Sequence, residues 1–331
     1  MKKILFSILA MAAMAACATD EPIALNQEAI QFGNAFVDNS VRGAVDPSYG
    51  TTNNLTSLKV YGAVEGVNIY NGVTIQGTLG AAVWNFVDTV PTQYWIADAD
   101  YIFDAVVDAT TVDTDTTTGL PTALNYTADG QTDMLHQRVT CTGKINESGI
   151  VPFTFTHLLS KVKLTVENTT AQTASGYRYT ITDIALTNVY KTGSYNVPTA
   201  DAVKADSNAV GTWTYGTTGT HAIDDMTIAS NTTEECAKEV LLIPGAEVGI
   251  TFNVNVQMQD SLDSNKWKII TTTPKTYDNV VTLAANTAYN FKVSVGLNEE
   301  IEFTVKTLES WVDPTVNKDI VDPAPADPDQ E

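Results

Sequence analysis

The sequence predicts an all-β protein built from two antiparallel β-sandwich domains in series. From Leu55 onward apolar residues alternate with polar ones, and clusters of Gly, Asn, Asp and Thr bound these runs. Such alternation is typical of antiparallel sheets with one solvated face, packed in pairs, and not of the fully covered parallel sheets of α/β enzymes. The 331 residues exceed one ordinary domain of ~100–200 residues, so we expect two domains.

The clearest strand segments place apolar residues two positions apart, with Lys, Thr, Asn, Glu or Ser between them. One face of each strand is therefore expected to contact solvent. These apolar positions are Leu58 and Val60; Val73 and Ile75; Val162, Leu164 and Val166; Ile250, Phe252, Val254, Val256 and Met258; Tyr289, Phe291, Val293 and Val295; and Ile301, Phe303 and Val305.

The N-terminus has the pattern of a signal peptide. Lys2 and Lys3 precede an apolar stretch, residues 4–16, which is too short to span a bilayer as a helix. The stretch ends in Met-Ala-Ala-Cys, which resembles a bacterial lipobox and implies a lipid on Cys17. The alternative is an ordinary signal peptide that happens to contain a cysteine.

Composition divides the rest of the chain. Residues 30–37 form a strand-like piece in an otherwise separable N-terminal segment, and residues 146–150 interrupt the alternation near the middle. After Trp311, aspartates and prolines make a tail that cannot bury enough apolar surface to fold alone. The expected organisation is a signal peptide at 1–17, an N-terminal segment at 18–42, sandwiches at 43–150 and 151–311, and a tail at 312–331.

The charge and the cysteines exclude several classes of protein. The formal net charge of −21 argues against nucleic acid as a partner, because phosphates are bound by an excess of Lys and Arg. Cys141 and Cys236 are too far apart in sequence for a compact metal or redox motif. We expect two buried thiols, with one disulfide as the alternative.

No motif for catalysis or cofactor binding is present. The histidines His136, His157 and His221 are not spaced as metal ligands, and His157 continues the face of an aromatic strand, which favours a hydrogen-bonded core histidine. Asp113 and Asp115 lack the glycine and glutamate of a calcium loop. We therefore expect no enzyme, no catalytic residue, no metal and no cofactor.

Several segments together resemble the fimbrillin family of Bacteroidetes, the subunits of type V pili. Acidic residues after Cys17 are similar to the signal that exports lipoproteins of these bacteria to the cell surface. The other markers are QYWIADADYIFDAVV at 93–107, PFTFTHLLSKVKLTVEN at 152–168, LLIPG at 241–245, TLAANTAYNFKVSV at 282–295, and Trp311 in the final strand. The resemblance implies an outer-membrane lipoprotein precursor with two transthyretin-like sandwiches.

The resemblance also implies a mechanism of assembly. An N-terminal strand, with Ile30, Phe32 and Phe36 as its apolar residues, occupies a groove in the precursor. An Arg-specific protease cuts between Arg42 and Gly43, and a C-terminal segment of a neighbouring subunit takes the place of the released strand. The alternative for Arg42 is an ordinary surface arginine in a linker.

The candidate donor segment contains Ile301, Phe303, Val305 and Trp311. The prolines beyond Trp311 are unfavourable for a long donor strand, so Trp311 could instead close the chain's own second domain. The implied partners are other fimbrial subunits, the processing protease and the outer membrane through the lipid on Cys17, with the adhesion receptor unidentified. The rival interpretations are a glycan-binding surface lipoprotein, in which exposed Trp and Tyr side chains gather on one face, and a secreted β-sandwich hydrolase.

Overall fold

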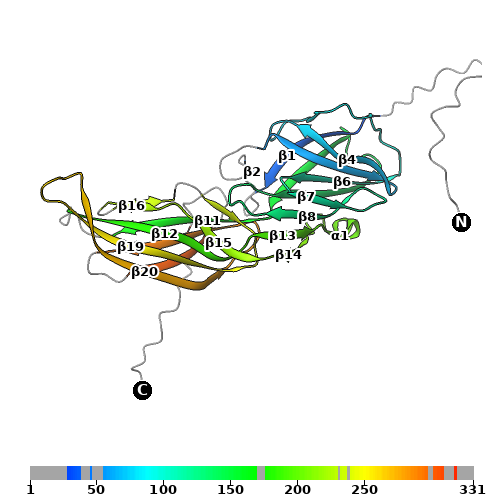
Figure 1. Cartoon of the computed structure of the whole chain (residues 1–331). Coiled ribbons are helices and arrows are strands. Elements are labelled where there is room, and N and C mark those ends of the chain that lie inside the picture. Colours follow the sequence, from blue (N-terminus) through cyan, green and yellow to red (C-terminus); the bar gives the residue numbers. More distant parts are fainter. Residues whose placement is uncertain are drawn as a thin grey trace, which may run out of the picture.

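The computed structural model describes residues 28–38, 45–46, 55–169, 176–229, 232–236, 239–296, 301–308 and 317–318. In these residues the chain is an all-β protein with one short helix, α1 (Ala200–Ala205). Figure 1 shows an elongated molecule with a lobe at each end. The described part contains no helix long and apolar enough to cross a membrane.

An eight-stranded sheet forms most of the first lobe, in the order β2-β1-β10-β9-β6-β3-β4-β5. Apolar side chains of its strands make one core, which is rich in aromatic rings. The strands are β1 (Gln31–Asp38), β2 (Val45–Asp46), β3 (Ser57–Val64), β4 (Val67–Gln76), β5 (Asn85–Phe86), β6 (Asp100–Val107), β9 (Leu135–Thr142) and β10 (Ile150–His157).

A four-stranded sheet combines strands from the two halves of the sequence. Its order is β14-β13-β8-β7, so β13 (Thr192–Asn196) pairs with β8 (Pro121–Thr127) across a long separation in the chain. The outer strands are β7 (Thr111–Thr114) and β14 (Thr212–Tyr215). The domain division at residue 150 stays a prediction. The sheets show that β10 and β13 pair with strands of the first 150 residues, and that β14 pairs with β13.

Two sheets face each other across the core of the second lobe, with apolar residues of both contributing. One has the order β17-β11-β21-β22-β23, with β18 also on β11; the other has the order β15-β12-β19-β20, with β16 also on β12. Their strands are β11 (Ser160–Asn168), β12 (Tyr177–Tyr190), β15 (Thr218–Ala222), β16 (Met226–Ile228), β17 (Thr233–Glu235), β18 (Val240–Leu242), β19 (Glu247–Gln259), β20 (Trp267–Thr282), β21 (Thr287–Val295), β22 (Glu302–Leu308) and β23 (Asn317–Lys318).

Among the strands that the structure describes, the predicted antiparallel pairing holds for most pairs, with two exceptions. β1 pairs with β10 in parallel, and β11 pairs with β21 in parallel. In both cases the partners are far apart in sequence, as a parallel pair requires, because its connection must return to the starting end of the sheet. Alternation of apolar and polar residues shows that a strand has one solvent-exposed face. It does not show whether the neighbouring strand runs parallel or antiparallel.

Candidate functional site: the groove that holds the N-terminal strand

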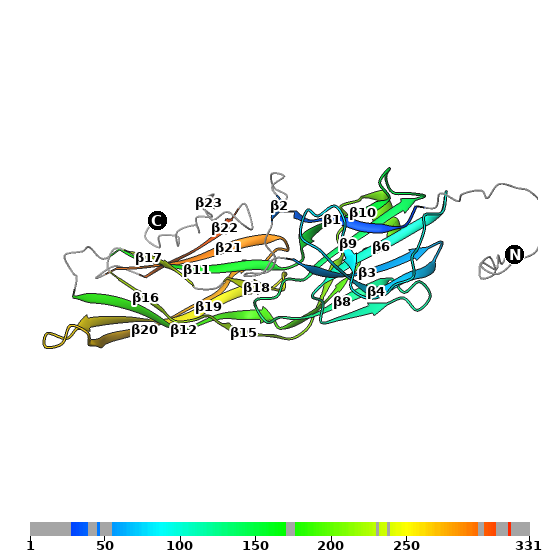
Figure 2. The same cartoon turned by 90° about the horizontal axis from the view of Figure 1, so that it is seen from above.

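The N-terminal strand β1 lies inside the first lobe and is bonded along both of its edges. One edge pairs with β10, from Gln31 opposite Ile150 to Val37 opposite Phe155. The other edge bonds to the segment 80–95, through Ile30 N to Gln93 O at 2.9 Å, Asn34 N to Ala81 O at 2.7 Å, Gly80 N to Ala35 O at 3.0 Å and Trp84 N to Phe32 O at 2.8 Å. Figure 2 shows β1 beside β10 along the edge of the lobe. β1 therefore completes the hydrogen bonding of two other segments.

Phe32 is the centre of the apolar contact that β1 makes. Its side chain is 1% exposed, and its ring packs against four others of the same core. The ring centroids lie 5.3 Å from Tyr70, 6.0 Å from Phe86, 5.6 Å from Phe103 and 5.9 Å from Phe153. Because the partners come from β4, β5, β6 and β10, Phe32 joins strands from across the sheet.

A bulge in the middle of β1 changes which residues face the core. The register with β10 shifts between Gly33 and Phe36, and Asn34 has a φ of 46°. A Cβ on Gly33 would lie 1.9 Å from the Ala82 carbonyl oxygen, so only glycine allows this close approach. Beyond the bulge Val37 is fully buried.

The bulge explains where the predicted groove-filling residues lie. Ile30 and Phe32 are buried, whereas Phe36 is only half-buried and its ring lies over Gly80. Strict alternation from Phe32 leads to Phe36, and the extra residue in the bulge gives the buried position to Val37 instead. A Gly-Asn step inside a strand pattern is the sequence signal that could have indicated the bulge.

The predicted processing and lipidation residues lie outside the described residues. Cys17, Arg42 and Gly43 are all in this part of the chain, as is Trp311. β1 ends at Asp38, shortly before Arg42, and the next described strand, β2, pairs with the end of β1. A cut after Arg42 would thus separate β1 covalently from every later strand.

The candidate donor residues pack on this chain's own second core. β22 lies between β21 and β23, and its residues Ile301, Phe303 and Val305 are half-buried. The ring of Phe303 lies 4.7 Å from Tyr277 and 5.8 Å from Phe291, centroid to centroid. These residues are less enclosed than Phe32, since each stays partly open to solvent.

A buried charge network ties the four-stranded sheet to the eight-stranded one. The carboxylate of Asp104 accepts from His136 Nε2 at 2.7 Å, and from Arg138 Nη2 at 2.8 Å and Nε at 2.9 Å. The same guanidinium donates to the carbonyls of Pro121 and Pro198, at 2.8 and 2.7 Å. The arginine thereby holds β8 and the chain before α1 against β9, and its donors are occupied by structural partners.

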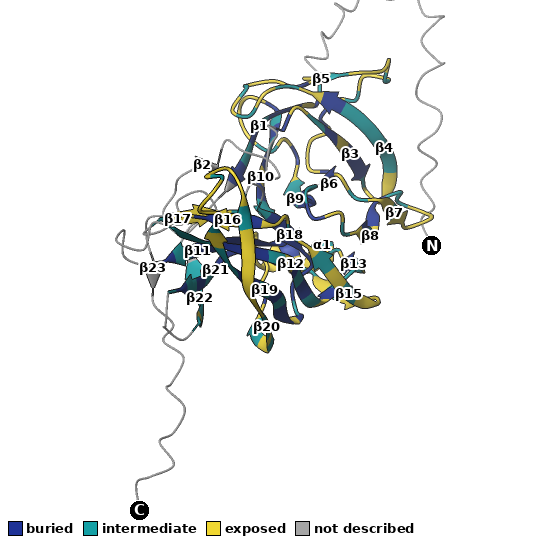
Figure 3. Cartoon of the chain, turned by 60° about the vertical axis from the view of Figure 1, so that its left-hand side comes forward, coloured by how far each residue is buried: buried dark blue, intermediate teal, exposed yellow. Residues whose placement is uncertain are grey.

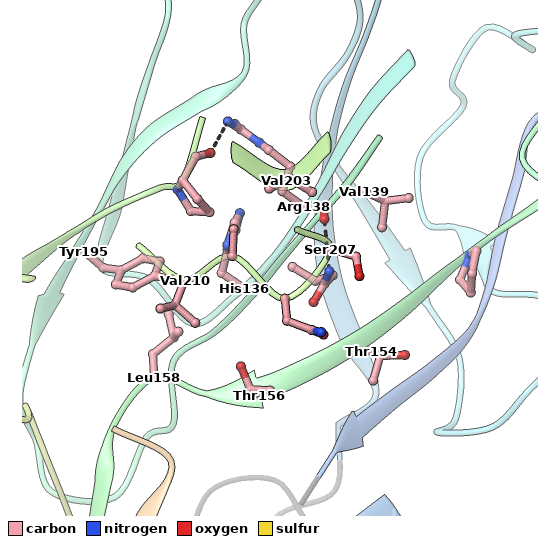
Figure 4. Close-up of a pocket in the computed structure, with 15 residues that line it drawn as sticks. His136, Arg138, Val139, Thr154, Thr156, Leu158, Tyr195, Val203, Ser207 and Val210 are labelled. Atoms are coloured by element: carbon pink, nitrogen blue, oxygen red, sulfur yellow. Dashed lines mark hydrogen bonds between the residues drawn. The ribbon is translucent and has the colours of Figure 1, made fainter. Parts of the chain in front are cut away.

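A cavity lies beside this network. It has a volume of about 640 Å³. In the view of Figure 4, Arg138, Val139 and Val203 lie at the top, Thr154 and Thr156 at the bottom, and His136, Ser207 and Val210 between them. Its polar lining includes His136 and Ser207, and the Nε2 of His136 is bonded to the buried Asp104. The two carboxylates that the hydrolase interpretation requires are absent from this lining.

The remaining histidines and cysteines have structural surroundings. His157 is buried and its Nδ1 contacts Asp133, so the prediction of a hydrogen-bonded core histidine is confirmed. Burial, followed by the charge of Lys191, lowers the pKa of His221. Cys141 and Cys236 are free thiols, half-buried rather than buried as expected. Within the described ranges no group of His, Cys, Asp and Glu is arranged to hold a metal ion.

The tryptophans lie mainly in packed positions. Trp84 and Trp95 are buried, Trp213 is half-buried, and Trp267 is half-buried beneath the guanidinium of Arg178, 4.4 Å from the ring centroid. None of these four is an exposed platform for a sugar ring. The fifth, Trp311, lies outside the described residues.

Comparisons with known proteins agree on one family. The model of the family described as fimbrillin-like matches residues 49–311. Similar solved structures include a cell adhesion protein of Bacteroides uniformis (16% identity, TM-score 0.51) and a fimbrial protein of Bacteroides vulgatus (14% identity, TM-score 0.53); each alignment covers 86% of this chain and 99% of the other. A cell adhesion protein of Bacteroides ovatus, at 17% identity and a TM-score of 0.50, aligns over 86% of this chain and 98% of its own. No curated protein matches the sequence.

Proposed function

Because the chain belongs to the fimbrillin-like family, a family of fimbrial structural proteins, we propose that it is a cell-surface fimbrial subunit polymerised by strand exchange. In this proposal the chain is exported as a lipoprotein with its lipid on Cys17. Cleavage after Arg42 frees residues 18–42, and a strand of another subunit occupies the place of β1. The role is structural and adhesive, with no reaction catalysed.

The placement of β1 is the observation that carries the proposal. This strand of eight residues lies upstream of Arg42, yet it is bonded on both edges and supplies Phe32 to the core. Removing it would leave the edge of β10 and the segment 80–95 without partners and would open a groove lined by aromatic rings. An extended segment with an aromatic side chain at the position of Phe32 could restore both kinds of contact at once.

The same contacts explain why cleavage and exchange are separate steps. A cut in the chain after Asp38 breaks no hydrogen bond of β1 and exposes no part of Phe32. The cut strand stays bound until a competitor with a similar set of contacts displaces it, since an exposed edge and apolar groove are costly in water. A fully seated strand would dissociate slowly, which suits a non-covalent polymer.

The test is proteolysis of the purified precursor without its lipid. Treatment with an Arg-specific protease should give a product that begins at Gly43, measured by mass, and a ladder of heat-sensitive oligomers in electrophoresis without boiling. The matched control is Arg42→Gln, which keeps β1 intact and should give neither. A product that begins at Gly43 and stays monomeric after β1 has been released would refute strand exchange.

A further inference from the structure

The end of the hairpin formed by β19 and β20 is an exposed apolar surface. This hairpin tip, residues 257–270, contains Met258, Leu262, Ile269 and Ile270, which are 42%, 95%, 52% and 51% exposed. Figures 1 and 2 show the hairpin at the extremity of the second lobe, directed away from the first. In the view of Figure 3, β20 is coloured largely as exposed. Large apolar side chains gathered on one protruding element mark a contact surface more often than scattered ones do.

A bulge lies within the exposed part of the hairpin. The pairing of β19 with β20 shifts between Val256, opposite Thr271, and Gln257, opposite Ile269, so Ile270 is an extra residue on β20. Regular alternation would turn one of two consecutive isoleucines toward the sandwich core. At the bulge Ile269 and Ile270 are both exposed, in a part of the hairpin that extends past the core.

The hairpin tip, together with the neighbouring Arg178, has an excess of one positive charge in a protein of net charge −21. Arg178, Lys266 and Lys268 surround it, against the acidic residues Asp260 and Asp263. Lys266 pairs with Asp263 at 3.3 Å and is 73% exposed, so solvent and other partners can still reach its ammonium group. Apolar and cationic groups thus lie together at this extremity.

The opposite extremity of the molecule has the complementary composition. There the turn between β3 and β4 exposes Val67, and the segment before β6 exposes Tyr94 and Ile96, at 59%, 44% and 49%. Glu65 and Asp98 are exposed among them.

Backbone and side-chain hydrogen bonds hold these groups together near the start of β1. Tyr94 bridges to Ala29, Ile96 N donates to Tyr101 Oη at 2.7 Å, and Glu65 N donates to Asp100 O at 2.9 Å. Figure 2 shows that β1 begins at the end of its lobe farthest from the hairpin. We call this surface of Glu65, Val67, Tyr94, Ile96 and Asp98 the acidic end.

We propose that the hairpin tip of one copy binds the acidic end of a second copy, head to tail. Two different surfaces at opposite ends of a subunit give a heterologous contact, which extends into an open filament instead of closing a dimer. Ile269 and Ile270 supply the apolar contact with Tyr94 and Ile96, and Lys266 and Lys268 face Glu65 and Asp98. The contact requires no cleavage at Arg42, so it is separate from strand exchange and aligns subunits before it.

The test uses the full chain with Arg42→Gln, in which strand exchange cannot begin. Its three cysteines are replaced by serine. One variant carries Ile270→Cys and another Ile96→Cys. A mixture of the two should form a disulfide-linked dimer under mild oxidation at low salt, while each alone should stay largely unlinked. Val210→Cys, 75% exposed and between the ends, is the matched control.

A charge exchange gives the second readout. Lys268→Glu should reduce the yield of the mixed dimer about tenfold. Asp98→Lys in the other copy should restore the yield, because the two residues then again carry opposite charges. Cross-linking of Ile270→Cys with itself would show a symmetric contact and overturn the proposal. The proposal would also be overturned if Val210→Cys cross-linked as efficiently as the Ile270→Cys and Ile96→Cys mixture, or if that mixture gave no dimer at low salt. None of these results bears on strand exchange after cleavage.

Discussion

Replacing Phe32 with alanine should loosen β1 without unfolding the rest of the chain. Phe32 is 1% exposed and touches four aromatic rings. Deleting a buried phenylalanine costs about 3–5 kcal/mol. If β1 opens as a local unit, this loss appears in its opening equilibrium, and 3 kcal/mol alone raises the open fraction by about two orders of magnitude.

Hydrogen exchange at the Trp84 amide measures this opening directly. Trp84 N donates to Phe32 O at 2.8 Å, so the amide exchanges when β1 leaves the groove. In Phe32→Ala we expect exchange about a hundredfold faster, while amides of β19 in the second lobe keep their rates. Phe36→Ala is the control, because Phe36 is half-buried and its removal should cost much less. Unchanged exchange at Trp84 in Phe32→Ala, or an equal effect in Phe36→Ala, would refute the assignment of Phe32 as the main anchor of β1.

Three further outcomes follow from the geometry. Asp104→Asn should lower the free energy of unfolding in urea by about 3–5 kcal/mol, because it leaves the Arg138 guanidinium buried without its carboxylate. Gly33→Ala should speed exchange at the start of β1, because the new methyl group meets the Ala82 carbonyl oxygen. Burial, followed by the charge of Asp100, raises the pKa of Cys141 to about 11, so its thiol stays protonated at pH 8. Iodoacetamide should therefore modify Cys141 more slowly than it modifies the amino acid cysteine in solution. The rate of modification should rise with pH up to about pH 11.

The first two of these predictions have matched controls. Asp100→Asn removes a solvent-exposed ion pair with Lys204 and should change stability much less than Asp104→Asn does. Gly176→Ala places a methyl group where nothing lies within 4 Å and should leave exchange unaltered. If Asp100→Asn destabilises the protein as much as Asp104→Asn does, the burial of the Asp104 charge is not what makes its network stabilising. Fast alkylation of Cys141 at pH 8 would show that the thiol is more accessible than its surroundings indicate.

The sequence was sufficient for the strands that follow a simple alternation. Ile250, Phe252 and Val254 are buried as expected, because β19 lies in the middle of its sheet there. The alternation fails at Met258, which is exposed where β19 extends past the core. It fails again at Phe36, because a bulge adds a residue and reverses the faces. Periodicity predicts faces only while the pairing stays in register.

The network around Asp104 could not be predicted from local sequence. Asp104, His136 and Arg138 lie on β6 and β9, which are paired in the sheet but well separated along the chain. No spacing rule joins an acidic residue to a histidine and an arginine on another strand. The placement of β1 beside β10 is non-local in the same way, and only the family resemblance suggested that a groove receives the N-terminal strand.

The direction of the long strands determines how a filament of such subunits would respond to pulling. β12, β19 and β20 have 14, 13 and 16 residues and run along the long axis of the molecule. Hydrogen bonds between strands are perpendicular to the strands, so tension along the axis shears many of them together instead of opening them one after another. β1 lies along the same direction beside β10. A strand seated in its place would therefore be loaded in shear, the geometry in which a short β-strand resists extraction best.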